Sequence, residues 1–166
     1  ISGFSQYDIF IIAGLVFALI ADMFLMIEEI NYFIHGLLFF LFMHICYIIA
    51  LSIRYQFNYY DIIILAMIIL ISFSYYAVIH KAKGRLYVPV IIYMIVLSAV
   101  VLLAIGTFIK TMSPKGVLVM LAAIFFAVSD GILACNQFVK KIPHSTVITW
   151  SLYAPAQLLF ALSCYY

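Results

Sequence analysis

Long apolar segments, separated by short polar breaks, account for most of the chain. Six of them hold about 20 residues each, which is the length a helix needs to cross the hydrocarbon core of a bilayer. They lie at 8–27, 32–53, 62–79, 88–109, 117–135 and 146–165. Only helices and closed β-barrels satisfy the backbone inside lipid, and the alternation of a barrel strand is absent. The pattern predicts six transmembrane α-helices.

The breaks between these segments carry charged residues or a Pro or Gly that ends a helix. They lie at 28–31, 54–61, 80–85, 111–116 and 136–145. None is long enough for a separate folded domain, so we expect one transmembrane domain over 1–166. The membrane side of the first, third and fifth breaks carries five basic residues against three on the opposite side, Arg54, Lys110 and Lys115, which favours the first side as cytoplasmic.

Composition supports a membrane protein and excludes several other classes. Hydrophobic residues make up 69% of the 166 residues and charged residues only 8%, against about 25% charged in soluble domains. A net charge of +2 without a basic tract argues against a nucleic-acid partner. The three cysteines are an odd number without metal-ligand spacing, so we expect free thiols. The expected surroundings are the lipid bilayer.

Ionisable residues inside membrane spans are rare and costly, so each one is a candidate functional residue. Asp22 and Asp130 are the two acids of this kind. Each lies six residues before the break that follows its segment, about 9 Å at 1.5 Å per residue. The first and fifth segments run in the same direction, so both carboxyl groups approach the same membrane face at matching depth.

Small residues accompany both acids at helical spacing, which lets neighbouring helices approach closely. We therefore expect both acids to face helix partners instead of lipid. The alternative is that each acid is only a structural hydrogen-bonding group between helices. The small residues concerned are Gly14 and Ala18 before Asp22, and Ala123, Ala127 and Gly131 around Asp130.

The second segment adds a deep histidine and a tyrosine. His44 and Tyr47 are three residues apart and share a helix face, whereas His35 lies on the opposite side near the interface. A buried His44 requires a polar partner, and a structural role is nearly as well supported as a catalytic one. Ser129 adjoins Asp130, but adjacent helix residues point about 100° apart, which disfavours activation of that hydroxyl.

Further polar candidates lie in the fourth and sixth segments and in the breaks. Tyr153 and Gln157 are four residues apart with Pro155 between them, which indicates a shared face and a bend in the helix. The side of the two acids also holds basic loop residues and an amide that offer donors to a phosphate headgroup. The candidates for substrate binding are His44, Tyr47, Arg85, Tyr93, Asn136, Tyr153 and Gln157.

Five stretches in register resemble the lysoplasmalogenase (YhhN-like) family of polytopic membrane enzymes. They are 14–22, 36–47, 85–93, 125–138 and 153–157, and the strongest contains Ser129, Asp130 and Gly131. The chain departs from the family at Ala21, where members have Gly. The family has about eight helices, with two further ones upstream that this sequence does not show, so we expect either a truncated chain or a reduced family member.

The resemblance implies hydrolysis of the vinyl ether bond of lysoplasmalogens, giving a fatty aldehyde and glycerophosphoethanolamine or glycerophosphocholine. It implies no cofactor and no metal. Our hypothesis is that Asp22 and Asp130 form an acid/base pair, one protonated and one ionised, as in paired-carboxylate enzymes with oxocarbenium-like intermediates. His44, Tyr153 and Gln157 would orient water or stabilise charge. The resemblance also implies a multi-pass integral membrane protein. It would lie in the plasma or inner membrane of a bacterium, or in the endoplasmic reticulum of a eukaryote.

Two other functions stay open on the sequence. The first is a metal-dependent membrane lipid hydrolase with Asp22, His44 and Asp130 as zinc ligands. The second is a small proton-coupled transporter that uses the acids as a proton relay. The sequence does not decide between a monomer and a homodimer, nor which acid donates the first proton.

Overall fold

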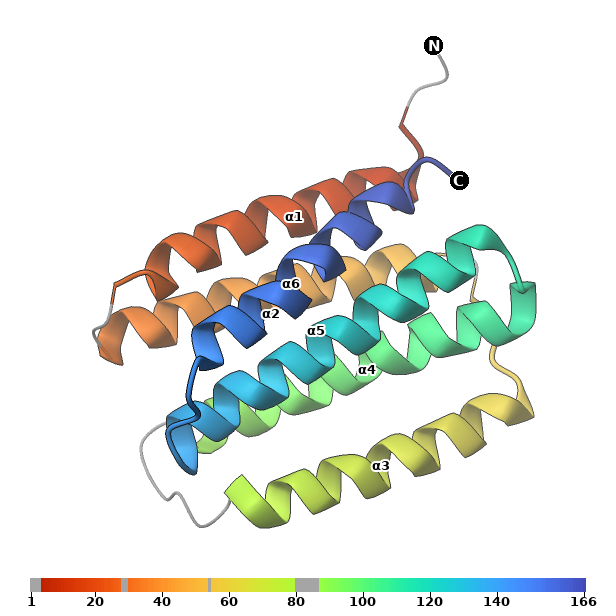
Figure 1. The fold of residues 1–166 in the computed structure, drawn as a ribbon. Coiled ribbons are helices and arrows are strands. Elements are labelled where there is room, and N and C mark those ends of the chain that lie inside the picture. The colour runs from red at the N-terminus through yellow and green to blue at the C-terminus, as the bar shows by residue number, and fades with distance from the viewer. Residues whose placement is uncertain (1–3, 28–29, 54, 80–86) are drawn as a thin grey trace.

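The fold is an all-α bundle, seen as a ribbon in Figure 1, which confirms the expected helical class. The computed structural model describes residues 4–27, 30–53, 55–79 and 87–166, and no strand occurs among them. The helices begin and end within three residues of the expected segments. They are α1 (Gln6–Leu25), α2 (Ile30–Ser52), α3 (Tyr59–Ile79), α4 (Tyr87–Thr111), α5 (Pro114–Phe138) and α6 (Ser145–Leu162).

Five of the helices, namely α1, α2, α4, α5 and α6, are long and apolar enough to cross a membrane by length and composition. In α3 the apolar stretch that can be assessed, Tyr59–Ser74, is shorter. These helices, with the short connections between them, make the chain a multi-pass integral membrane protein.

Helix starts are fixed by local chemistry at the polar breaks. Ser5 caps α1 by accepting a hydrogen bond from the Asp8 amide, and the Asp8 carboxylate accepts one from the Ser5 amide in return. Ser113 caps α5 in the same way through the Gly116 amide, with Pro114 at the first helical position. These caps satisfy amides that have no partner inside the helix.

Consecutive helices run antiparallel, so the bundle has two ends. At the first end α1, α3 and α5 finish and α2, α4 and α6 begin; the rings of Phe33 and Phe138 meet there at 6.3 Å. At the second end the start of α1 meets the end of α6, where Tyr7 and Ser163 are hydrogen-bonded at 2.5 Å. Figure 1 shows the start of α1 and the C-terminus of the chain near this second end.

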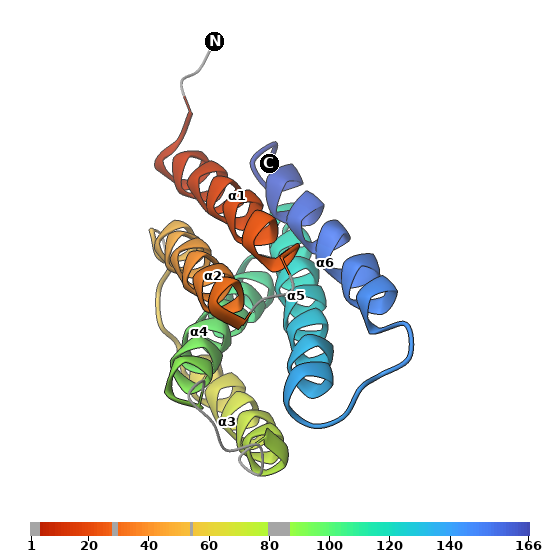
Figure 2. The same ribbon diagram turned by 90° about the vertical axis from the view of Figure 1, so that its left-hand side faces the viewer.

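Helix neighbours are not in simple sequence order. α1 packs on α2 and α6, α5 packs on α4 and α6, and α2 packs on α4. α3 packs on α4, touches α5 and lies at the edge of the bundle, as Figures 1 and 2 both show. This arrangement leaves α3 with most of its side chains exposed.

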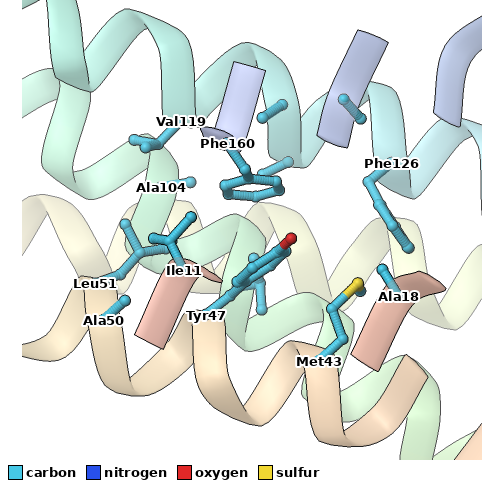
Figure 3. Packing of buried hydrophobic residues seen from close by; sticks show 14 of the residues in the cluster. Ile11, Ala18, Met43, Tyr47, Ala50, Leu51, Ala104, Val119, Phe126 and Phe160 are labelled. Carbon is cyan, nitrogen blue, oxygen red and sulfur yellow. The ribbon is translucent and has the colours of Figure 1, made fainter. Parts of the chain in front are cut away.

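The core between α1, α2 and α6 depends on close approach at a glycine. A Cβ on Gly14 would collide with the buried ring of Tyr47, so this position of α1 accepts no side chain without a shift. The Tyr47 ring packs in turn on Phe160 with centroids 4.2 Å apart, as seen in Figure 3. The small residue at this position thus allows the close helix packing expected from the sequence.

A buried ion pair ties α3 to α4 at the second end, and the sequence analysis did not identify it. Lys110 donates to the Asp61 carboxylate at 2.6 Å, and Tyr55 donates to the other carboxylate oxygen at 2.6 Å. The Asn58 amide supplies a third hydrogen bond to Asp61. Burial, together with the hydrogen bond to Asp61, raises the pKa of the Tyr55 phenol, so Tyr55 remains a donor.

Candidate active site

Asp22 is joined to α6 by a tyrosine. Its carboxylate, half-buried on α1, accepts a hydrogen bond of 2.8 Å from the hydroxyl of Tyr153. Tyr153 itself is buried between helices. The side chain of Asp22 therefore faces a helix partner, in agreement with the spacing of small residues before it.

Asp130 is joined to α4 in the same manner. The hydroxyl of the buried Tyr93 donates to one oxygen of the Asp130 carboxylate. Each of the two acids thus has a tyrosine from a neighbouring helix as its hydrogen-bond donor. The sequence named all four residues, and the structure adds the pairing.

An aromatic cluster lies between the two acid–tyrosine pairs. Neighbouring rings in it have centroids between 4.8 and 5.9 Å apart and mostly meet edge to face. Edge-to-face contact is a favoured arrangement for such rings. The members of this aromatic cluster are Phe40, His44, Tyr93, Phe126 and Tyr153.

The two carboxyl groups belong to helices that do not pack on each other within the described parts of α1 and α5. Asp22 and Asp130 are therefore linked through the aromatic cluster. This is a different geometry from a carboxyl dyad that shares one proton.

His44 lies in the middle of the aromatic cluster and is buried. Its Nδ1 is 2.7 Å from the carbonyl oxygen of Phe40, one turn earlier in α2. A carbonyl oxygen only accepts, so Nδ1 carries the hydrogen. His44 thus satisfies one ring nitrogen locally while its ring faces Tyr93 and Phe126.

Tyr47 and Gln157 form a separate polar pair on the second-end side of the aromatic cluster. The Tyr47 hydroxyl donates to Gln157 Oε1 at 2.7 Å, and Gln157 Nε2 donates to the sulfur of Met43 at 3.3 Å. These bonds connect α2 to α6. The pair is one helical turn from Tyr153, so it supports the position of that residue.

Two residues, Asn136 and Arg85, were expected to contact a lipid headgroup, and only Asn136 can be placed. Asn136 uses its side-chain carbonyl to accept a hydrogen bond of 2.8 Å from the Ile142 amide, which holds the connection after α5. Arg85 lies outside the described residues. Lys140 and Lys141 are exposed on the same connection at the first end.

Three further residues named from the sequence can be placed. Ser129 is buried and donates to the Thr149 carbonyl of α6 at 3.1 Å, pointing away from Asp130 as the helical angle predicted. His35 is exposed, with its ring stacked on Phe24 at 5.6 Å. Among the described residues no group of three or more His, Cys, Asp or Glu side chains could hold a metal ion, which disfavours the zinc alternative.

A cavity of about 330 Å³ opens between α2, α3, α4 and α5, and Asp130 and Tyr93 belong to its lining. Apart from these two, its polar lining residues are Ser72 and Ser98. Asp22 is not part of the lining. The two acids therefore differ in their surroundings, because Asp130 lines the cavity and Asp22 does not.

The small residues of α5 serve two purposes. Ala123 is buried in helix packing, as expected, but Ala127 and Gly131 line the cavity. A Cβ on Gly131 would meet nothing within 4 Å, so the expectation of close helix contact there was wrong. The helix opposite stands away from this part of α5 because the cavity lies between them.

Phe40 and Phe126, which complete the aromatic cluster, were not among the residues selected from the sequence. Phe40 lies four residues before His44, and Phe126 lies four residues before Asp130. That spacing puts each phenylalanine on the face of its polar neighbour and is a usable signal. With 15 Phe and 13 Tyr in the chain, however, the aromatic residues alone do not stand out.

Comparison with known proteins gives a family and two similar curated proteins. A family model described as the YhhN family matches residues 1–164. Lysoplasmalogenase TMEM86A of Bos taurus is 31% identical over 160 residues, and the alignment covers 92% of this chain and 64% of that protein. The Homo sapiens protein of the same name is 30% identical over 161 residues with the same coverage. The chain thus spans about 64% of the length of these relatives. No solved structure matches the chain.

Proposed function

Because the chain belongs to the YhhN family, we propose that it is a membrane hydrolase that cleaves the vinyl ether bond of lysoplasmalogens. The products are a fatty aldehyde and a glycerophospho-alcohol such as glycerophosphoethanolamine or glycerophosphocholine. Relatives named lysoplasmalogenase support this activity. The observation that carries it is a carboxyl group, Asp130, held by a tyrosine in the wall of an apolar cavity within a membrane span.

The reaction requires few groups. An acid protonates the alkenyl carbon farther from oxygen, which leaves an oxocarbenium ion at the carbon bonded to oxygen. Water adds to that carbon and loses a proton to a base, giving a hemiacetal. The bond from this carbon to the glycerol oxygen then breaks as that oxygen gains a proton and the hemiacetal hydroxyl loses one. General acid–base catalysis of this kind contributes about 10²–10⁴-fold in rate.

Asp130 is the proposed proton donor. It lies in the cavity wall, where an apolar substrate comes within reach of its carboxyl group. The hydroxyl of Tyr93 fixes one of its oxygens and leaves the other for the substrate. After proton transfer the carboxylate is stabilised by that hydrogen bond, and it is the base nearest to the incoming water.

Asp22 is the proposed anionic partner. Its carboxylate stabilises the oxocarbenium ion through space, because charges interact strongly where water is excluded. Tyr153 holds Asp22 and contacts Phe126 and Phe40, so it sets the position of this charge relative to the aromatic cluster. His44, Tyr47 and Gln157 keep the cluster and Tyr153 in place. Asn136 and Arg85 remain proposed contacts to the headgroup.

The test is hydrolysis by the purified protein of a 1-alkenyl lysophospholipid and its saturated 1-alkyl analogue, scored as aldehyde release. Asp130→Asn and Asp22→Asn are expected to lose at least about 100-fold in kcat, the lower range for general acid–base catalysis. Only the vinyl ether substrate should react.

Asp8→Asn is the matched control. Asp8 is only partly buried in the first turn of α1, at the opposite end of the helix from Asp22, so this variant makes the same change on the same helix without touching the site. It should keep nearly full activity. Full turnover by Asp130→Asn would refute the proton donor, and cleavage of the saturated analogue would refute the proposed chemistry.

A further inference from the structure

The cavity continues well beyond Asp130 toward the middle of the membrane. Its lining on α4 extends from Tyr93 to Val101, eight residues or about 12 Å at 1.5 Å per residue. Its lining on α5 extends in the same direction from Asp130 to Ile124, about 9 Å. On α3 the deepest lining residue is Ile68. Val101, Ile124 and Ile68 therefore form the deep end of the cavity.

The deep part of the cavity offers a ligand only apolar contact. Its two polar side chains, Ser72 and Ser98, are 3.2 Å apart and hydrogen-bonded to each other, which joins α3 to α4 across the wall. A ligand with polar groups along its length would lose hydrogen bonds to water and gain none there. A hydrocarbon chain meets no such cost.

The cavity is open on the side where α3 lies at the edge of the bundle. Ile71 of α3 and Val128 of α5 belong to its lining, yet they are 66% and 47% exposed. Both lie within apolar helices, so this opening faces the acyl chains of the bilayer. An occupant therefore enters from the lipid and not from water.

The size of the cavity favours one chain. Its volume of about 330 Å³ is at the small end of the roughly 300–1,000 Å³ of small-molecule sites. Gly131 adds space next to Asp130, because a Cβ there would project into the opening without meeting an atom within 4 Å. A chain in the cavity thus passes close to the α5 backbone beside the carboxyl group.

We infer that the deep part of the cavity binds the single hydrocarbon chain of an ether lysolipid, and that Val101, Ile124 and Ile68 limit the chain length. The identity of the lipid rests on the proposed function. The headgroup end lies toward the first end of the bundle, the ether bond lies beside Asp130, and the chain extends toward Val101. Chain-length preference is therefore set at the deep end of the cavity, away from the acids.

The test uses Val101→Phe in the full chain, with Val88→Phe as a matched control. Val88 is on the same helix, 61% exposed and outside the cavity lining, so it receives the same change without entering the site. Binding of saturated 1-alkyl lysophosphoethanolamines with decyl and hexyl chains is measured by displacement of a fluorescent lysolipid. An extended decyl chain is about as long as the roughly 12 Å from Tyr93 to Val101, whereas a hexyl chain ends short of Val101. Val101→Phe should weaken decyl binding at least about tenfold relative to hexyl, since one methylene in an apolar pocket changes discrimination by about 10–200-fold.

The binding test separates this inference from the proposed function, because the saturated lipids are not cleaved. If the protein selects lipids by chain length but releases no aldehyde from the alkenyl lipid, the proposed hydrolysis is wrong and the proposed binding site is still supported. If another protein segment or a bulk phospholipid filled the cavity, Val101→Phe would bind both chain lengths as wild type does, and the inference would be wrong.

A second variant tests the same inference if Val101→Phe does not fold. Val101→Ala removes bulk from the deep end and should shift the preference toward the longer chain. An unchanged ratio of decyl to hexyl binding in a folded Val101→Ala protein would also overturn the inference.

Discussion

Removal of the Tyr93 hydroxyl is the smallest change that tests the candidate site. Tyr93→Phe removes the donor to Asp130 and keeps the ring, which packs edge to face on His44 at 5.1 Å. Because Tyr93 is buried, no bulk water replaces the hydroxyl. The variant therefore isolates one hydrogen bond without changing the apolar wall of the cavity.

The expected magnitude follows from the charge that Asp130 acquires in the proposed reaction. A hydrogen bond to a charged group contributes about 1.5–3 kcal/mol, which corresponds to roughly 10–100-fold in rate at about 1.4 kcal/mol per decade. The bond strengthens as the proton leaves Asp130, so the loss should appear in kcat. KM should change little, because the variant keeps the surface that contacts the substrate chain.

The assay is release of fatty aldehyde from an alkenyl lysophospholipid, coupled to an aldehyde dehydrogenase. Tyr32→Phe, which removes an exposed hydroxyl at the start of α2, is the control and should match wild type. In an Asp130→Asn background, Tyr93→Phe should cause no further loss, since both changes act on one interaction. A wild-type kcat in Tyr93→Phe, or a loss confined to KM, would refute the reasoning.

Two further predictions concern stability, measured as the thermal unfolding midpoint in detergent. Lys110→Met leaves the Asp61 carboxylate, which is only 3% exposed, without its cation. Because Lys110 itself is 20% exposed, we expect the free energy of unfolding to fall by about 3 kcal/mol, the low end of the cost of breaking a buried ion pair. Adding Asp61→Asn should recover part of this loss, and an unchanged midpoint in Lys110→Met would show that the pair does not hold α3. Gly14→Ala drives a methyl group into Tyr47 and should cost about 1–3 kcal/mol. In Gly131→Ala the same methyl group meets open space, so the unfolding midpoint should equal or exceed that of the wild type. Equal losses of stability in the Gly14 and Gly131 variants would contradict the assigned packing.

The sequence was sufficient for the helices because hydrophobicity along the chain determines which segments enter lipid. The ends of α1 and α5 also have readable signals, Ser5 with Asp8 and Ser113 with Pro114. Asp22 and Asp130 could be selected because a carboxyl group inside an apolar segment is costly and rare. These inferences concern one segment at a time and need no knowledge of neighbours.

The site geometry depends on which helices are neighbours, and the sequence does not contain that information in readable form. The cavity exists because α2 packs on α4 while α3 lies at the edge. The same helical spacing of small residues therefore has opposite outcomes, close packing at Gly14 and open space at Gly131. The buried ion pair joins Asp61, in the second break, to Lys110, just before the fourth break, and both lie on the same predicted membrane side. Charge complementarity on that side was the overlooked signal.

The separation of Asp22 from Asp130 suits an enol ether better than a shared-proton dyad would. The reaction requires one neutral acid within reach of the alkene and one negative charge that does not compete for the same proton. In the proposed mechanism Asp130, in the cavity wall, is the neutral acid, and Asp22, on a helix that does not pack on α5 in the described parts, is the negative charge. The aromatic cluster between them adds ring faces with negative electrostatic potential, which attract a cation where water is excluded. In a direct carboxyl pair, mutual repulsion would also keep one member protonated and one ionised, but the shared proton would be held between the two carboxyl groups instead of being directed at the alkene.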